Sequence, residues 1–144
     1  MTVSPETLAR LARYDTPTIC NVIELFDIRP RNVGYMDCRI RAAFPEMPPM
    51  VGFAATAVIR CADPSSSTVY DVLEAQVRQM ESLARPAVVV FQDVDDPPVG
   101  ATFGEVMCST YQAFGAVGLV TSGGGRDLAQ VRAIDFPVFT GSTI

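Results

Sequence analysis

The sequence contains neither lysine nor histidine, because all 11 basic residues among its 144 are arginine. The absence of lysine excludes a lysine Schiff base and a Walker-type phosphate-binding lysine. The absence of histidine removes the most common general base and metal ligand. Any catalysis must therefore use carboxylates, arginine, cysteine, serine, tyrosine, backbone amides or a metal ion held by oxygen ligands.

Leader segments, long apolar runs, positive charge and paired cysteines are also absent or scarce, and each of these bears on where the protein is found or what it binds. No charged-then-apolar leader and no apolar run of 18 residues is found, so we expect neither secretion nor membrane spanning. A net charge of −5 disfavours nucleic acid as a partner. The four cysteines form no C-x-x-C pair, which disfavours a zinc or thioredoxin-type motif and favours reduced thiols in a cytoplasmic protein: Cys20, Cys38, Cys61 and Cys108.

The remaining composition, 49% hydrophobic and 19% charged, is typical of a globular protein, and the length predicts a single domain over residues 1–144. Residues 1–28 carry two helix starts, at Ser4-Pro5 and Thr16-Pro17. Residues 29–50 form a Pro-rich excursion without periodicity. In residues 51–144 helices and strands alternate, which predicts a layered α/β core. The expected strands cover 51–61, 86–91, 117–121 and 137–140, and the expected helices begin at Thr68 and cover 104–114 and 127–134.

The densest chemical signal is S-G-G-G-R-D at 122–127, between a predicted strand and a predicted helix. The glycines allow positive φ and close backbone approach, and Arg126 offers a fork of donors suited to a carboxylate. Asp127 supplies one oxygen ligand of the type that Mg²⁺ or Mn²⁺ prefers. The alternative is a tight turn in which Asp127 only caps the helix. The glycines alone do not decide between the two.

A second loop, A-T-F-G-E-V-M at 101–107, also enters a predicted helix. Gly104 would let the backbone amides of Glu105, Val106 and Met107 point at an anion. The alternative is a plain helix start in which Glu105 complements the helix dipole. Since both loops follow predicted neighbouring strands, both could open on one edge of the sheet, where α/β domains place their ligands.

The spacing of these residues resembles a known family. Glu105 is followed by 20 residues and then by Arg126-Asp127. This spacing, with G-E-V-M at its start and P-V-F after it, resembles the pattern of the class II pyruvate aldolases of the RraA-like (regulator of ribonuclease activity A) family. D-T-P-T-I-C-N-V at 15–22 and V-G-F-A-A-T-A at 51–57 resemble that family too. The resemblance implies an α/β/β sandwich of the swivelling phosphohistidine-domain type and a homotrimer or hexamer.

By this resemblance, the Gly104–Met107 loop and Arg126 would hold an α-keto acid. Asp127 would ligate Mg²⁺ or Mn²⁺, and Glu105 would lie near water on the metal. The implied reaction is retro-aldol cleavage of 4-hydroxy-4-methyl-2-oxoglutarate or a related 4-hydroxy-2-oxo acid to pyruvate, with oxaloacetate decarboxylation as a side activity. Elementary chemistry agrees, because a pyruvate enolate needs either a lysine imine or a metal ion as electron sink, and the sequence contains no lysine.

Two departures from the family pattern leave alternatives open. The loop reads S-G-G-G where many members have D-G-x-x, so one acidic group is missing. The chain stops at Ile144, whereas members continue with further strands, which is expected of a shortened form, a fragment or part of a longer chain. The competing hypotheses are a non-catalytic, protein-binding regulator of ribonuclease activity and an inactive truncated member.

Two further inferences concern packing and assembly. Cys108 and Tyr111 follow Glu105 on its predicted helix, where we expect core packing rather than a nucleophile and an acid. The excursion over 29–50 carries Met36, Met47, Met50, Tyr35 and Phe44, residue types enriched where subunits meet. We therefore expect this excursion to contribute to contacts in a trimer, although a loop folded over its own core is the alternative.

Overall fold

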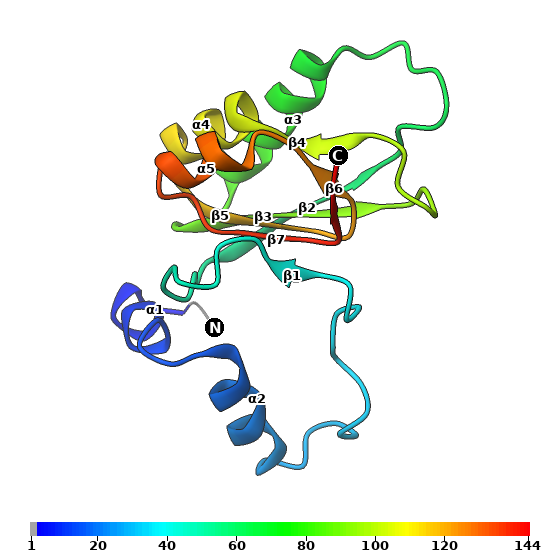
Figure 1. Ribbon diagram of the computed structural model, residues 1–144. Coiled ribbons are helices and arrows are strands. Elements are labelled where there is room, and N and C mark those ends of the chain that lie inside the picture. Colours follow the sequence, from blue (N-terminus) through cyan, green and yellow to red (C-terminus); the bar gives the residue numbers. More distant parts are fainter. Residues whose placement is uncertain (1–2) are drawn as a thin grey trace.

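The computed structural model describes residues 3–144 and shows a mixed α/β fold built on two sheets (Figure 1). The larger sheet has five strands in the order β1-β7-β5-β3-β2, and all neighbours are parallel except β1 and β7. Its strands are β1 (Arg41–Ala42), β2 (Phe53–Ile59), β3 (Ala87–Asp93), β5 (Ala116–Thr121) and β7 (Val138–Thr140). The helices are α1 (Pro5–Leu11), α2 (Thr16–Glu24), α3 (Val69–Ser82), α4 (Glu105–Ala113) and α5 (Leu128–Ala133).

The strand order explains why the helices α3, α4 and α5 lie on one face of this sheet (Figure 1). The parallel strands β2, β3, β5 and β7 succeed one another in a single direction across the sheet. Crossovers between parallel strands are almost always right-handed, so steps in one direction place every connecting helix on the same side. The opposite face is left to residues that precede β2.

A second, smaller sheet consists of β4 (Ala101–Phe103), β6 (Gly124–Gly125) and β8 (Ser142–Thr143), all parallel. Its strands continue the chain beyond the carboxyl ends of larger strands, since β6 and β8 follow β5 and β7 after short turns. This sheet was not predicted. Its segments are too short for periodicity to be visible, and two glycines have no intrinsic preference for a strand.

The core lies between the larger sheet and the helices α3, α4 and α5. Continuous apolar runs in β3 and β5 supply its centre, and the largest fully buried side chains are aromatic or long: Tyr111, Phe91, Phe103, Phe136, Met80 and Leu119. Thr68 begins α3 with a reciprocal capping box to Asp71. The predicted buried strand at 86–91 and the helix start at Thr68 are thus confirmed.

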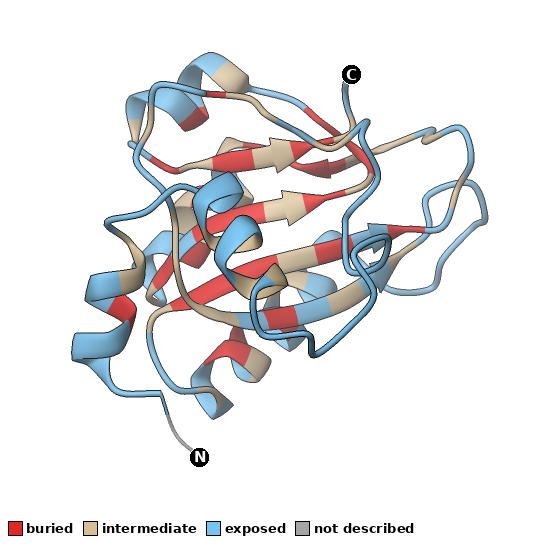
Figure 2. Ribbon diagram, turned by 90° about the horizontal axis from the view of Figure 1, so that it is seen from below, coloured by how far each residue is buried: buried red, intermediate tan, exposed pale blue. Residues whose placement is uncertain are grey.

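The N-terminal part of the chain is much more exposed than the core (Figure 2). Ser4 caps α1 and α2 begins at Thr16, both as predicted. Asp15 caps α2, and none of the residues of α2 is buried. The excursion over 29–50 divides in two. Its second half forms β1 and packs Phe44 and Met47 against the core, whereas Tyr35 and Met36 in its first half are exposed. The prediction that the whole excursion is irregular was therefore wrong at β1.

Candidate functional site

A cavity of about 310 Å³ lies where the first turns of α3 and α4 face each other. Arg126 and Asp127 lie on its wall beside the start of α4. Of the predicted site residues, Gly104, Val106, Met107, Arg126 and Asp127 all line it. Sequence reasoning missed its third side, formed by Val69, Tyr70 and Leu73 of α3, because no motif in the sequence links that helix to the other two loops.

The two predicted loops meet because β4 and β6 are parallel neighbours in the smaller sheet, with Phe103 opposite Gly125. The Arg126 backbone N–H donates to the Phe103 carbonyl at 3.2 Å, so the pairing continues to the mouth of the cavity. The expectation that both loops follow neighbouring strands is confirmed, since β3 and β5 are parallel neighbours, but the short strands β4 and β6 lie between these strands and the helices. A Cβ at Gly125 would overlap the Phe103 ring, so this glycine serves close approach.

Positive φ in this loop occurs at Asp127 (φ 59°, ψ 33°) and not at the three glycines before it. The left-handed region costs a residue with a Cβ on the order of 1 kcal/mol, although aspartate tolerates it better than most. Asp127 makes no side-chain hydrogen bond to cap its own helix α5. Its Oδ2 instead accepts a hydrogen bond from the Glu105 backbone N–H at 3.3 Å. Asp127 thus occupies the N-cap position of α5, but its side chain does not cap that helix.

Gly104 allows the start of α4 and the Arg126-Asp127 pair to lie in contact. A Cβ at this position would lie 2.8 Å from Asp127 Oδ2 and 3.2 Å from Arg126 Nε. The Arg126 Nε lies 3.6 Å from Asp127 Oδ2, which pairs the two charges. Because the first-turn N–H groups of a helix have no partner within it, those of Val106 and Met107 can donate to an anion.

The backbone N–H group of Glu105 contacts this site, whereas its carboxylate points elsewhere. The Ser109 hydroxyl donates to Glu105 Oε1 at 2.6 Å, one turn along α4. Glu105 is not among the residues that line the cavity. The Glu105 N–H group lies beside the site but donates to Asp127 and not to an open anion site, and its carboxylate lies along the helix, so the role predicted for Glu105 stays a prediction.

A divalent cation would find one protein carboxylate here. No group of three or more aspartate, glutamate or cysteine side chains suitable for a metal ion occurs among residues 3–144. Asp127 is partly exposed, and its Oδ1 takes part in none of the hydrogen bonds between described residues. A single accessible carboxylate oxygen suits Mg²⁺, which keeps several waters and accepts substrate oxygens. The donor set thus fits a cation held mainly by water and substrate.

Cys108 and Tyr111 lie beneath the site, and both are fully buried. Burial, reinforced by the charges of Glu105 and Asp127, raises the pKa of the Cys108 thiol to about 12. Burial also raises the pKa of Tyr111, whose ring packs against Phe91. A thiol that stays protonated is a poor nucleophile. The predicted packing role of both residues is confirmed.

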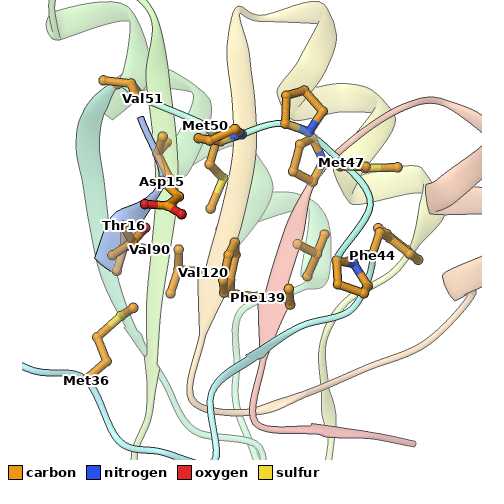
Figure 3. A pocket seen from close by; sticks show the side chains of 18 of the residues that line it. Asp15, Thr16, Met36, Phe44, Met47, Met50, Val51, Val90, Val120 and Phe139 are labelled. Carbon is orange, nitrogen blue, oxygen red and sulfur yellow. The ribbon is translucent and has the colours of Figure 1, made fainter. Parts of the chain in front are cut away.

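A larger cavity, of about 590 Å³, lies on the opposite face of the main sheet (Figure 3). Methionines, prolines and the outward side chains of Val90, Val120 and Phe139 line it, and Asp15 at its edge is the one charged lining residue among those described. Sequence reasoning did not anticipate a cavity here. Its walls hold no convergent set of polar groups.

The fold and the smaller cavity together define a mixed α/β protein in which a helix start, an arginine and an aspartate converge. A family model described as RraA-like, Aldolase/RraA, matches residues 16–144. The chain belongs to the RraA-like family. No curated protein matches the sequence. None of the helices within residues 3–144 is long and apolar enough to cross a membrane.

Solved structures share the fold at low sequence identity. A crystal structure described as novel cellulases from microbes associated with the gut ecosystem is 23% identical with a TM-score of 0.77. RraAS2 of Streptomyces coelicolor, described as an unusual member of the RNase ES inhibitor RraA protein family, is 21% identical with a TM-score of 0.70. An uncharacterized protein from Pseudomonas syringae pv. tomato is 17% identical with a TM-score of 0.72.

The chain is covered almost completely by these similarities but spans only 61%, 66% and 61% of the three solved chains, in the same order. The family description joins aldolases to RraA proteins, and RraAS2 is described through a ribonuclease inhibitor family. Membership therefore covers enzymes and ribonuclease inhibitors alike.

Proposed function

We propose that this protein is a divalent-metal-dependent pyruvate aldolase, a carbon–carbon lyase that cleaves a 4-hydroxy-2-oxo acid to pyruvate. The observation that carries the proposal is the left-handed Asp127, whose carboxylate meets the first N–H of α4 beside Arg126 instead of capping α5. A backbone held in a sparsely populated region so that charged groups converge is typical of functional sites. A family that includes aldolases supports the same assignment.

The residues of the site match the demands of this reaction. The Arg126 guanidinium and the N–H groups of Val106 and Met107 would bind the keto-acid carboxylate. Asp127 would hold Mg²⁺ or Mn²⁺, which when bound supplies the electron sink for the enolate. Glu105 would assist proton transfer through water, since its carboxylate lies one turn along α4 and not in the cavity. Oxaloacetate decarboxylation, which passes through the same enolate, is the expected side activity.

The direct test is pyruvate release from 4-hydroxy-2-oxo acids and from oxaloacetate, with and without EDTA. We expect activity to disappear with EDTA and to return with Mg²⁺ or Mn²⁺. Borohydride with pyruvate should trap nothing on the protein, because it contains no lysine to form an imine. Full activity in excess EDTA would contradict the metal assignment.

For assembly we propose a homotrimer or a multiple of it. The support is a set of exposed apolar side chains directly after α2, where Leu25, Phe26 and Ile28 are 80%, 65% and 78% exposed. Apolar patches of this kind mark protein interfaces. Light scattering should give a mass of three or six chains. A stable monomer with full aldolase activity would contradict the proposal.

The same surface favours one second candidate, a protein-binding regulator of ribonuclease activity. Such a protein needs a docking surface and no metal. The two candidates separate in one comparison: a regulator should inhibit RNA cleavage by an RNase E-type enzyme even when Asp127 is replaced by alanine. An aldolase without that role should leave RNA cleavage unchanged.

A further inference from the structure

The carboxylate of Glu105 is held by the hydroxyl of Ser109. This hydroxyl donates to Glu105 Oε1 at 2.6 Å, and the two residues lie one turn apart on the same face of α4. Both residues are partly buried. A hydrogen bond to an ionised oxygen is roughly twice as strong as one between neutral groups. Ser109 therefore fixes the direction in which the Glu105 carboxylate points.

The main chain of Glu105 begins its side chain close to Asp127. The Glu105 backbone N–H donates to Asp127 Oδ2 at 3.3 Å. Helical side chains lean towards the N-terminus of their helix, and the first turn of α4 is where Asp127 lies. A Glu105 side chain free of Ser109 would therefore turn towards the Asp127 carboxylate. One hydroxyl group keeps the two carboxylates apart.

The separation of the two carboxylates matters for a divalent cation at Asp127. Mg²⁺ and Mn²⁺ prefer oxygen ligands, and a site with one carboxylate leaves the other positions on the ion to water and substrate oxygens. A second carboxylate would bind the ion more tightly and would take one of those positions. Metal-assisted chemistry on a keto acid needs positions that the substrate can occupy. Holding Glu105 away from Asp127 keeps these positions open.

We propose that Ser109 is a positioning residue that keeps the Glu105 carboxylate off the divalent cation at Asp127. The inference rests on the proposed cation site and adds to it a residue that the sequence motifs do not include. The hydroxyl acts through its hydrogen bond to Glu105 Oε1 and contacts neither the cation nor the substrate. Ser109 thus sets how tightly the cation is held and how many of its positions stay free.

A titration of the Ser109→Ala variant with Mn²⁺ tests the inference. The electron paramagnetic resonance signal of free Mn²⁺ gives the affinity, measured with and without saturating pyruvate. Ser109→Ala should bind Mn²⁺ about tenfold more tightly than the unmodified protein, a difference of about 1.4 kcal/mol. The relaxation rate of water protons should also show fewer water molecules on each bound Mn²⁺. A change in packing alone would not remove water from the ion.

Three further variants are matched to Ser109→Ala. Ser109→Thr keeps a hydroxyl group and should keep the Mn²⁺ affinity of the unmodified protein. Thr110→Val removes the neighbouring hydroxyl of α4, which donates to the Val106 carbonyl at 2.8 Å, and should also leave the affinity unchanged. Ser109→Ala combined with Glu105→Gln should lose the gain, because an amide replaces the carboxylate. Circular dichroism checks that each variant is folded.

The outcomes separate the inference from the function on which it rests. Equal Mn²⁺ affinity of Ser109→Ala and the unmodified protein would overturn the inference. A gain that persists with Glu105→Gln would overturn it too, because a group other than Glu105 would then supply the gain. The expected gain without pyruvate release from any 4-hydroxy-2-oxo acid would support the role of Ser109 and overturn the aldolase. Binding of Mn²⁺ by neither protein would overturn both.

Discussion

The two cavities on opposite faces of the five-stranded sheet differ in chemistry more than in size. The larger one, about 590 Å³, is lined by methionine, proline and valine with one carboxylate at its edge. The smaller one, about 310 Å³, brings an arginine, an aspartate and a helix start together. Reaction chemistry needs convergent polar groups at fixed positions, and only the smaller cavity supplies them. Volume alone would have selected the face that lacks these groups.

The comparison of the two cavities predicts that substitution of Arg126 or Asp127 has the largest effect on activity. Arg126→Ala and Asp127→Ala should each lower kcat/KM for pyruvate release by about 10²–10³, the usual effect of removing one preorganised charged group. Glu105→Ala should lose less, because its carboxylate is bonded to Ser109 and lies outside the cavity. Steady-state kinetics on folded variants, checked by circular dichroism, measure the series.

An Asp127→Ala variant with nearly normal kinetics would contradict the site assignment. A Glu105→Ala variant more damaged than Asp127→Ala would exchange the roles proposed for the two carboxylates.

A smaller loss is expected from Gly104→Ala. The added methyl group would lie 2.8 Å from Asp127 Oδ2 and must displace it. Displacement of a catalytic group by about 1 Å lowers rates by up to about 10², so we expect a loss of 10- to 10²-fold in kcat. The melting temperature is the control and should change little, because the groups that move are the ends of side chains. Equal kinetics in the variant would show that the contact between α4 and Asp127 has no catalytic importance.

Some of these features could be predicted from the sequence and others could not. Helix starts at Ser4 and Thr68 and the buried strand at 86–91 follow from local rules, so they were predictable. The meeting of Gly104 with Arg126-Asp127 was predictable as an association of two loops. Its cause, the pairing of β4 with β6, was not, since a two-residue strand of glycine depends on contact with Phe103 and has no local signal. The sandwich type and the roles of the site residues stay predictions.

The buried thiol below the site predicts an effect on stability and none on catalysis. In the unfolded chain the Cys108 thiol titrates near its ordinary pKa of 9.0, whereas burial raises the folded pKa to about 12. Below pH 9 both states keep the proton, and as the pH rises towards 12 only the unfolded state releases it. Stability is therefore lost across this window.

Urea unfolding at pH 8, 9 and 10 measures this loss, and the Cys108→Ala variant is the control. The variant should be less stable overall because a buried side chain is truncated, but its stability should fall less steeply with pH. Parallel pH profiles would show that Cys108 does not contribute to the alkaline loss.

The smallest effect is expected at the larger cavity. Met36 lines it and is 58% exposed. Met36→Ser should change kcat/KM by less than about twofold and stability by no more than about 0.5 kcal/mol, as is usual at exposed positions. The same assay measures this variant beside those of Arg126 and Asp127. A loss of activity at Met36 comparable to theirs would move the site to the other face of the sheet.

Binding of Mn²⁺ tests the central claim most directly, that Asp127 holds a divalent cation beside Arg126. The electron paramagnetic resonance signal of free Mn²⁺ can be followed as the protein is titrated in the presence of saturating pyruvate, which supplies further oxygen ligands, with Asp127→Asn as the matched variant of nearly identical shape. The account predicts that the unmodified protein removes the free signal at one ion per chain and that Asp127→Asn leaves the signal largely intact. Equal binding by the two proteins would contradict it.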